Sequence, residues 1–180
     1  MSLSVASDTF RIARRYSATL IETGTHIGLG LLGATYAGFE RMITCELFEA
    51  ILEQAKKNMG SQFGKISYYH GDSADCLPMM LREAGQIPCA ILLDAHATAG
   101  TEPSRCPLTR ELAVLKNTSR NDHLVMVDDF DLAGTPHLGG LGLSDIIERL
   151  REINPGYTFH ELGGVRPKML LMAAPPGFIP

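Results

Sequence analysis

Residues 19–30 read Thr-Leu-Ile-Glu-Thr-Gly-Thr-His-Ile-Gly-Leu-Gly, and the rest of the chain is organised around this stretch. An apolar run that ends on the acidic Glu22 and passes at once into spaced glycines is typical of a buried strand that delivers its end to a ligand. Glycines let the backbone approach that ligand closely and turn into the following helix, whose free N–H groups then face it. The stretch predicts a nucleoside-cofactor site at the end of the first strand.

Two glycine patterns overlap here. Residues 28–33, Gly-Leu-Gly-Leu-Leu-Gly, satisfy the dinucleotide pattern G-x-G-x-x-G. That pattern normally begins directly at the strand end, whereas here several residues lie between. Counted from the strand end, the spacing is instead Glu22-x-Gly24-x-x-x-Gly28-x-Gly30. This spacing resembles the first motif of the class I (Rossmann-like) methyltransferases that depend on S-adenosylmethionine (SAM).

Composition limits the classes of protein to consider. The 180 residues, 45% hydrophobic and 20% charged, predict one domain over 1–180, with an N-terminal helical extension over 1–16. A formal net charge of -4 provides no basic footprint for nucleic acid, and no apolar run is long enough to cross a membrane. The four cysteines lack C-x-x-C spacing, and residues 1–10 lack the pattern of a signal peptide. We therefore expect a cytoplasmic protein with a small-molecule partner.

Predicted strands and helices alternate along most of the chain. The expected strands are 18–22, 42–46, 65–70, 88–94 and 123–129, and the expected helices are 9–16, 27–37, 48–59, 74–84, 108–116 and 143–153. Two final strands, 157–162 and 168–174, have a connection too short for a helical crossover, which predicts an antiparallel hairpin. This order resembles the α/β methyltransferase fold. The resemblance implies a mostly parallel seven-stranded sheet in the order 3-2-1-4-5-7-6, with the last strand antiparallel and helices on both faces.

Acidic residues end, or closely follow, the first five predicted strands. They are Glu22, Glu46, Asp72, Asp94, Asp128 and Asp129. In open α/β sheets, ligands bind outside the carboxyl ends of the strands, so these side chains should line one edge of the sheet. They are candidates for a single site.

The methyltransferase resemblance implies SAM as the cofactor and S-adenosylhomocysteine (SAH) as the product. It places Glu22 opposite the amino acid part of the cofactor and Glu46 at the ribose hydroxyls. It also places Asp72 and Ser73 beside the adenine. Leu47 and Phe48 are candidates to pack on the adenine or ribose, although positions in the core explain them equally well. The expected cofactor-binding residues are Glu22, Gly24, Thr25, His26, Gly28, Gly30, Glu46, Leu47, Asp72, Ser73 and Asp94.

The acids after the fourth and fifth strands suggest a metal site. Neighbouring strands lie about 4.8 Å apart, so the carboxylates of Asp94, Asp128 and Asp129 should converge. Hard oxygen ligands suit Mg²⁺. The arrangement resembles the metal site of cation-dependent O-methyltransferases, including the macrolide and aminocoumarin sugar group, in which the metal lowers the pKa of a substrate hydroxyl. The alternative stays open: Asp128 or Asp129 caps a turn, and Asp94 lines the cofactor pocket.

His96 and Asp94 are the predicted catalytic residues. Histidine, with a pKa near 6.5, suits a general base that removes the acceptor proton. The stretch 94–101, Asp-Ala-His-Ala-Thr-Ala-Gly-Thr, also resembles a segment of bacterial methyltransferase-like proteins often found near sugar and polysaccharide genes. That resemblance implies a sugar as the acceptor. Four other histidines are weaker candidates: His26, His70, His123 and His137.

Taken together, the sequence predicts a SAM-dependent enzyme that methylates an oxygen of a small molecule such as a sugar, with possible Mg²⁺ assistance. A homodimer is the default expectation for such a domain. Three alternatives remain open. They are an NAD(P)-dependent oxidoreductase, a non-catalytic module that binds SAM or another nucleoside, and a non-methylating enzyme of the same fold.

Overall fold

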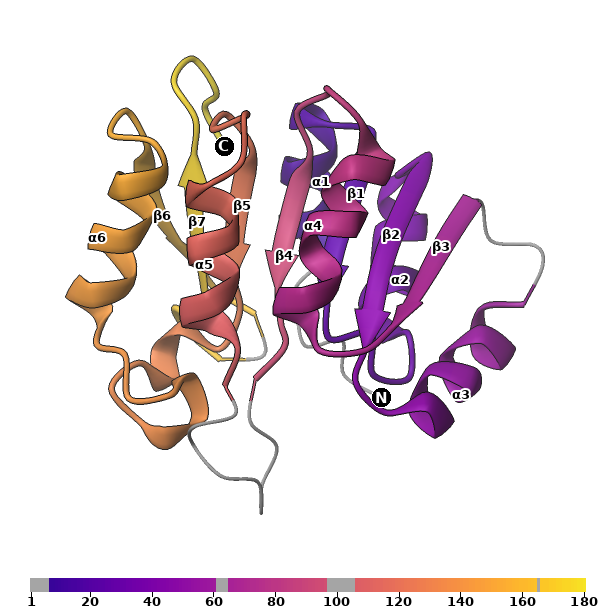
Figure 1. Cartoon of the computed structure of the whole chain (residues 1–180). Coiled ribbons are helices and arrows are strands. Elements are labelled where there is room, and N and C mark those ends of the chain that lie inside the picture. Colours follow the sequence, from indigo (N-terminus) through magenta and orange to yellow (C-terminus); the bar gives the residue numbers. More distant parts are fainter. Residues whose placement is uncertain (1–6, 61–64, 97–105, 165) are drawn as a thin grey trace.

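The computed structural model describes residues 7–60, 65–96, 106–164 and 166–180. Figure 1 shows a central sheet with helices packed on both of its faces. In chain order the first elements are α1 (Ser7–Tyr16), β1 (Thr19–Thr23), α2 (Leu29–Ala37), β2 (Arg41–Glu46), α3 (Glu49–Met59), β3 (Lys65–His70) and α4 (Ser73–Ala84). The later elements are β4 (Ala90–Leu93), α5 (Leu108–Lys116), β5 (Leu124–Val127), the short 3₁₀ helices η2 (Phe130–Leu132) and η3 (Pro136–Leu138), α6 (Leu143–Ile153), β6 (Thr158–Leu162) and β7 (Leu170–Ala174).

The sheet has seven strands in the order β3-β2-β1-β4-β5-β7-β6. Strands β1 to β5 pair in parallel, and β7 lies antiparallel between β5 and β6. In the register at the centre, Ile21 of β1 lies opposite Ile43 of β2 and Ile91 of β4. The predicted strand order, the mostly parallel sheet and the antiparallel hairpin are confirmed.

Two apolar cores hold the helices to the sheet. Successive side chains of a strand point to opposite faces, so Leu20 and Ile21 belong to different cores. Helices α4, α5 and α6 pack on the face of Ile21, and α1, α2 and α3 pack on the face of Leu20. The N-terminal helix is part of this packing, because Phe10 is fully buried. Burying one such side chain contributes roughly 1.5–3 kcal/mol.

The segment after β5 differs from the loop predicted over residues 130–142. It contains the two 3₁₀ helices η2 and η3. At the start of η3, the hydroxyl of Thr135 accepts a hydrogen bond from the backbone N–H of His137 at 3.3 Å. Glycines and a threonine cap gave no helical period in the sequence, so a single helical turn escaped prediction. Most of the loop expected over 96–107 lies outside the described residues.

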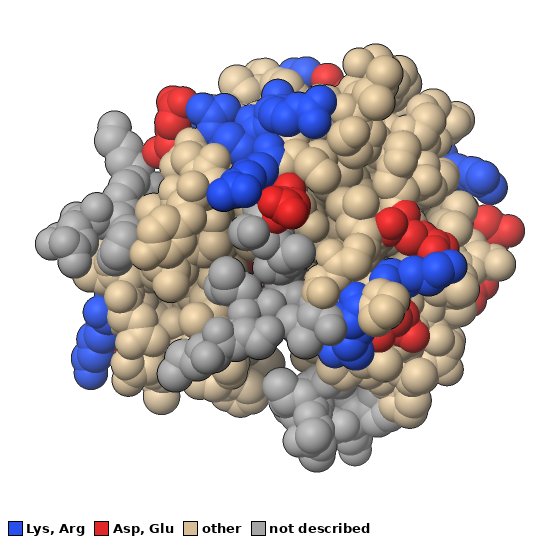
Figure 2. All heavy atoms as spheres, turned by 180° about the vertical axis from the view of Figure 1, so that it is seen from behind, with Lys and Arg blue, Asp and Glu red and all other residues tan. Residues whose placement is uncertain are grey.

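Surface charge on the described residues is mixed in sign. Figure 2 shows a face on which small groups of Lys and Arg lie beside Asp and Glu. On the α1 side, Arg14 pairs with Glu40 at 2.6 Å, and on α3 Lys56 pairs with Glu53 at 2.7 Å. Across the described ranges, the helices fall short of the length and apolar character that a membrane span requires.

Candidate functional site

The carboxyl ends of β1 to β5 meet at one edge of the sheet, the lower edge in Figure 1, and the glycine loop after β1 lies there. Gly24 and Gly28 have φ angles of +81° and +88°, which favour glycine. A Cβ atom on Gly24 would lie 2.6 Å from the backbone oxygen of Asp94. A Cβ atom on Gly30 would lie 1.9 Å from Oε1 of Glu22. The glycines therefore make the turn, let β4 approach and leave space for a carboxyl group under α2.

Glu22 occupies that space and is only 1% exposed. Burial raises the pKa of Glu22 to about 8, although the hydroxyl of Thr44, which donates to its Oε2 at 3.2 Å, acts in the opposite direction. The hydroxyls of Thr44 and Thr25 lie 2.7 Å apart and continue the network into the loop. A cationic group placed against Glu22 would favour its ionised form.

Glu46 ends β2 and fixes the loop from the other side. Its Oε2 accepts a hydrogen bond from the backbone N–H of His26 at 2.9 Å, and its Oε1 accepts one from Phe48 at 3.0 Å. Each carboxylate oxygen keeps a second lone pair for a ligand. The next residues, Leu47 and Phe48, are 49% and 47% exposed. The prediction that these two residues could lie in the core is therefore wrong. Their side chains form an exposed apolar surface beside Glu46.

Asp72 caps α4. Its side chain accepts a hydrogen bond from the backbone N–H of Ala74 at 3.0 Å. Its other oxygen pairs with Arg110, which projects from α5. Ser73 is buried at the start of α4. This end of the site is thus held by one helix start and one arginine.

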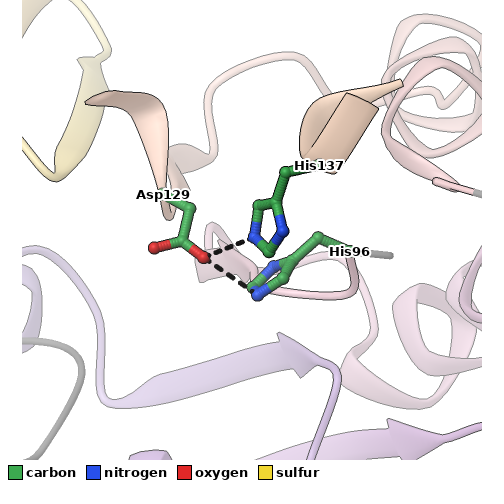
Figure 3. A group of neighbouring side chains, drawn as sticks. All are labelled: His96, Asp129 and His137. Atoms are coloured by element: carbon green, nitrogen blue, oxygen red, sulfur yellow. Dashed lines mark hydrogen bonds and ion pairs between the residues drawn. The ribbon is translucent and has the colours of Figure 1, made fainter. Parts of the chain in front are cut away.

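The ends of β4 and β5 bring together a second group of side chains, shown in Figure 3. His96 lies between two carboxylates: its Nδ1 is 3.4 Å from Oδ1 of Asp94, and its Nε2 is 3.0 Å from Oδ2 of Asp129. The Nε2 atom of His137 lies 2.7 Å from the same oxygen of Asp129. Both imidazoles point at one carboxylate, as Figure 3 shows. His96, Asp94 and Asp129 were expected at this edge, but His137 ranked only among the weaker histidines.

Asp129 is the centre of this group. Its other oxygen, Oδ1, pairs with Arg166 from the connection between β6 and β7. Arg166 also reaches Oδ2 of Asp131 at 2.6 Å. Burial alone would raise the pKa of Asp129, but His96, His137 and Arg166 outweigh burial and hold the pKa below its usual range. Asp129 is therefore ionised at neutral pH.

Asp94 and Asp128 lie close together, and the pKa values of both are raised, in contrast to that of Asp129. Burial raises the pKa of Asp94 well above its usual range, and the nearby Asp128 adds to the rise. Burial also raises the pKa of Asp128. Asp128 is 2% exposed, and within the described ranges its Oδ1 has no hydrogen-bond partner. Two crowded acids beside an ionised Asp129 favour the approach of a proton or a cation.

Glu111 on α5 is a buried acid that the sequence analysis missed. Burial raises the pKa of Glu111 to about 7, while the nearby hydroxyls of Ser73 and Thr23 act in the opposite direction. Neither of its carboxylate oxygens has a hydrogen-bond partner within the described part of the chain. A sequence signal was present, because Glu111 lies three residues after Leu108 on the apolar stripe of the helix.

Two of the remaining histidines have structural contacts. Nδ1 of His123 accepts a hydrogen bond from the backbone N–H of Cys89 at 3.1 Å, and burial lowers the pKa of His123 to about 4. His70 contacts the backbone oxygen of Leu47 at 3.2 Å. A hollow of about 240 Å³ next to His123 and Arg120 lies at the amino ends of the strands, away from the acidic edge.

Comparisons with known proteins identify the fold. No family model and no curated protein match the sequence. Among solved structures, the chain is similar to TomG, an O-methyltransferase of Streptomyces achromogenes involved in tomaymycin synthesis and solved with SAM, at 20% identity and a TM-score of 0.62 over 95% of this chain and 79% of that one. It is also similar to an O-methyltransferase of Bacillus cereus solved with SAH, at 17% identity and a TM-score of 0.64 over 94% and 80% of the two chains. The chain therefore has the class I methyltransferase fold.

Proposed function

We propose that the protein is a SAM-dependent methyltransferase that acts on an oxygen of a small-molecule acceptor. The observation that carries this proposal is the glycine loop, placed between the buried Glu22 and the strand-end Glu46 in a sheet of methyltransferase order. Two of the solved structures similar to this chain are O-methyltransferases with SAM or SAH bound.

The dinucleotide alternative has less support. Its pattern, residues 28–33, begins at the cap of α2 and continues inside the helix, whereas the turn after β1 is made by residues 24–28. A dinucleotide site requires the first glycine of the pattern to form that turn, so that the pyrophosphate reaches the start of the helix. Here the first glycine, Gly28, is the N-cap of α2, and the turn already begins at Gly24.

The cofactor half of the site consists of the glycine loop and the residues at the ends of β1, β2 and β3, and its residues each have a role in binding SAM. Glu46 accepts hydrogen bonds from the ribose hydroxyls, and the exposed Leu47 and Phe48 provide apolar surface beside it. Asp72 and Ser73 lie where the adenine is expected. Glu22 is placed to stabilise a cationic amino group near the start of α2. When bound, SAM supplies a methyl group activated by its sulfonium charge.

The acceptor half of the site, which Asp94, His96, Asp128, Asp129 and His137 form, must orient a hydroxyl of the acceptor and remove its proton. The hydroxyl oxygen forms a bond to the methyl carbon, the carbon–sulfur bond breaks, and the hydroxyl proton leaves to the protein or to water. Two arrangements of this half can serve: His96 as general base, or a divalent cation that lowers the pKa of the hydroxyl. Oδ1 of Asp128 has no hydrogen-bond partner among the described residues, and the pKa of Asp94 is raised; both fit a cation among Asp94, Asp128 and Asp129. A polyhydroxylated acceptor such as a sugar suits this polar surface.

The test is methyl transfer itself. Protein is incubated with methyl-labelled SAM and a panel of sugars and phenols, and the labelled product is counted. We expect transfer to at least one hydroxyl acceptor, with a loss of more than about a hundredfold in Asp94→Ala, since removing an acid–base or cation-holding group costs at least this much. Cofactor binding should stay measurable in that variant. The distant, exposed Asp8→Ala is the control.

Two results would overturn the proposal. One is SAH binding without transfer to any acceptor in the panel, which identifies a non-catalytic binding module. The other is turnover in Asp94→Ala equal to that of the wild type.

A further inference from the structure

We propose that His96, Asp129 and His137 form a binding site for a first-row transition metal ion rather than for Mg²⁺. The three residues come from the end of β4, the end of β5 and η3, and each offers one ligand atom. In Figure 3 the two imidazoles converge on the Asp129 carboxylate. This inference deepens the proposed function, because it replaces the cation among Asp94, Asp128 and Asp129 by an ion held through His96, Asp129 and His137. Metal binding itself does not require methyl transfer.

The spacing of the ligand atoms fits one ion. Nitrogen and oxygen ligands lie about 2.0–2.2 Å from such a metal, which separates neighbouring ligand atoms by roughly 3.0–3.4 Å. Oδ2 of Asp129 lies 3.0 Å from Nε2 of His96 and 2.7 Å from Nε2 of His137. All three atoms lie within 4.8 Å of one another. Small side-chain rotations therefore suffice to admit the ion.

The surroundings hold each ligand in place. Nδ1 of His96 faces Asp94 at 3.4 Å, and metal-bound histidines typically turn their second ring nitrogen to a carboxylate. Arg166 occupies Oδ1 of Asp129 and leaves Oδ2 for the ion. The backbone N–H of His137 is bound by the side chain of Thr135. These contacts distinguish the group from an accidental meeting of polar side chains.

The chemistry of the ligands selects the ion. Imidazole nitrogen suits Zn²⁺, Fe²⁺, Co²⁺ and Ni²⁺, whereas Mg²⁺ prefers oxygen ligands and keeps several waters. Two histidines and one carboxylate leave coordination positions open for water or for a substrate hydroxyl. With its Nε2 on the ion, His96 is not free to act as general base. The inference therefore assigns proton loss to a hydroxyl whose pKa the metal lowers.

The experiment titrates the chelator-treated protein with Co²⁺, followed by visible absorption and calorimetry, and separately with Mg²⁺. We expect one Co²⁺ per chain, bound more tightly than Mg²⁺. His137→Ala should weaken Co²⁺ binding by more than about a hundredfold, and Asp94→Asn by about tenfold to a hundredfold, as for residues that support a ligand. The matched control is His160→Ala. The ring of His160, in β6, contacts Thr158, so its removal should leave Co²⁺ binding unchanged. His137→Gln replaces His137→Ala if the alanine variant does not fold.

Three results would overturn the inference: no Co²⁺ binding by the wild type, unchanged Co²⁺ affinity when His137 is replaced, or Mg²⁺ bound as tightly as Co²⁺ and lost in Asp128→Asn. A parallel titration with SAH separates the two proposals. SAH binding without Co²⁺ binding overturns the metal site and leaves the proposed function standing. Co²⁺ binding without SAH binding supports the metal site and overturns the proposed function.

Discussion

The two halves of the acidic edge are held together in different ways. In the cofactor half, the carboxylates accept hydrogen bonds from backbone N–H groups: Glu46 from His26 and Phe48, and Asp72 from Ala74. In the acceptor half, Asp129 is held by side chains instead, from His96, His137 and Arg166. Backbone donors are fixed by the fold, whereas side-chain partners can move or be replaced. The comparison predicts a rigid cofactor half and an acceptor half whose charges respond to ligand and pH.

The largest expected effect is a loss of stability caused by a substitution in the glycine loop of the cofactor half. Gly24→Ala places a Cβ atom 2.6 Å from the backbone oxygen of Asp94, directly after β4, at a φ angle of +81°. Gly38→Ala is the matched control, since Gly38 has a φ of +88° but no atom within 4 Å of the added Cβ. The positive φ costs about 1–2 kcal/mol in either variant, and we expect Gly24→Ala to lose at least about 2 kcal/mol more of the free energy of unfolding. Urea denaturation measures both losses, and equal losses would contradict the close contact.

The second prediction concerns Glu111, which lies beside Thr23 and Ser73 and feels the charge of His96. Its folded pKa of about 7 exceeds the ordinary value of 4.5, so its contribution to stability is present below pH 4.5 and is lost as pH rises to about 7. Glu111→Gln removes this dependence. The variant should match the wild type near pH 4.5 and be more stable by about 3 kcal/mol at pH 8. Denaturation at both pH values checks this, and a difference that does not change with pH would contradict it.

The third prediction compares the halves directly through cofactor affinity. Glu46→Gln should weaken SAH binding about tenfold, since hydrogen bonds to a charged acceptor contribute about 1.5–3 kcal/mol. Asp129→Asn, an equivalent change in the acceptor half, should leave the Kd for SAH unchanged within about twofold. Calorimetric titration gives both constants. An equal loss in the two variants would mean that the halves are not separate.

The smallest expected effect comes from Arg166→Ala. The side chain of Arg166 is 42% exposed, and exposed ion pairs contribute about 0–1 kcal/mol to stability. We expect a loss of less than about 1 kcal/mol in urea denaturation. A loss above about 2 kcal/mol would show that the acceptor half is as rigid as the cofactor half.

The same difference explains what the sequence could predict. The glycine loop of the cofactor half follows from a local pattern, an apolar strand, an acid and spaced glycines within residues 19–30, and the strand order followed from the resemblance to the methyltransferase fold. Asp94 and Asp129 could be predicted as site residues because they lie at the ends of predicted strands. His137 and Arg166 lie in segments without period and reach Asp129 only through the fold, so no spacing indicated them. Glu111 could have been found, because its place on an apolar helix stripe is itself a local signal.

The most direct test of the central claim is a calorimetric titration of the purified protein with SAH, with and without Mg²⁺, and with NADH as the control. We expect micromolar binding of SAH and no heat from NADH. Binding of NADH without SAH, or no binding of either compound, would contradict the assignment of the glycine loop to a SAM site.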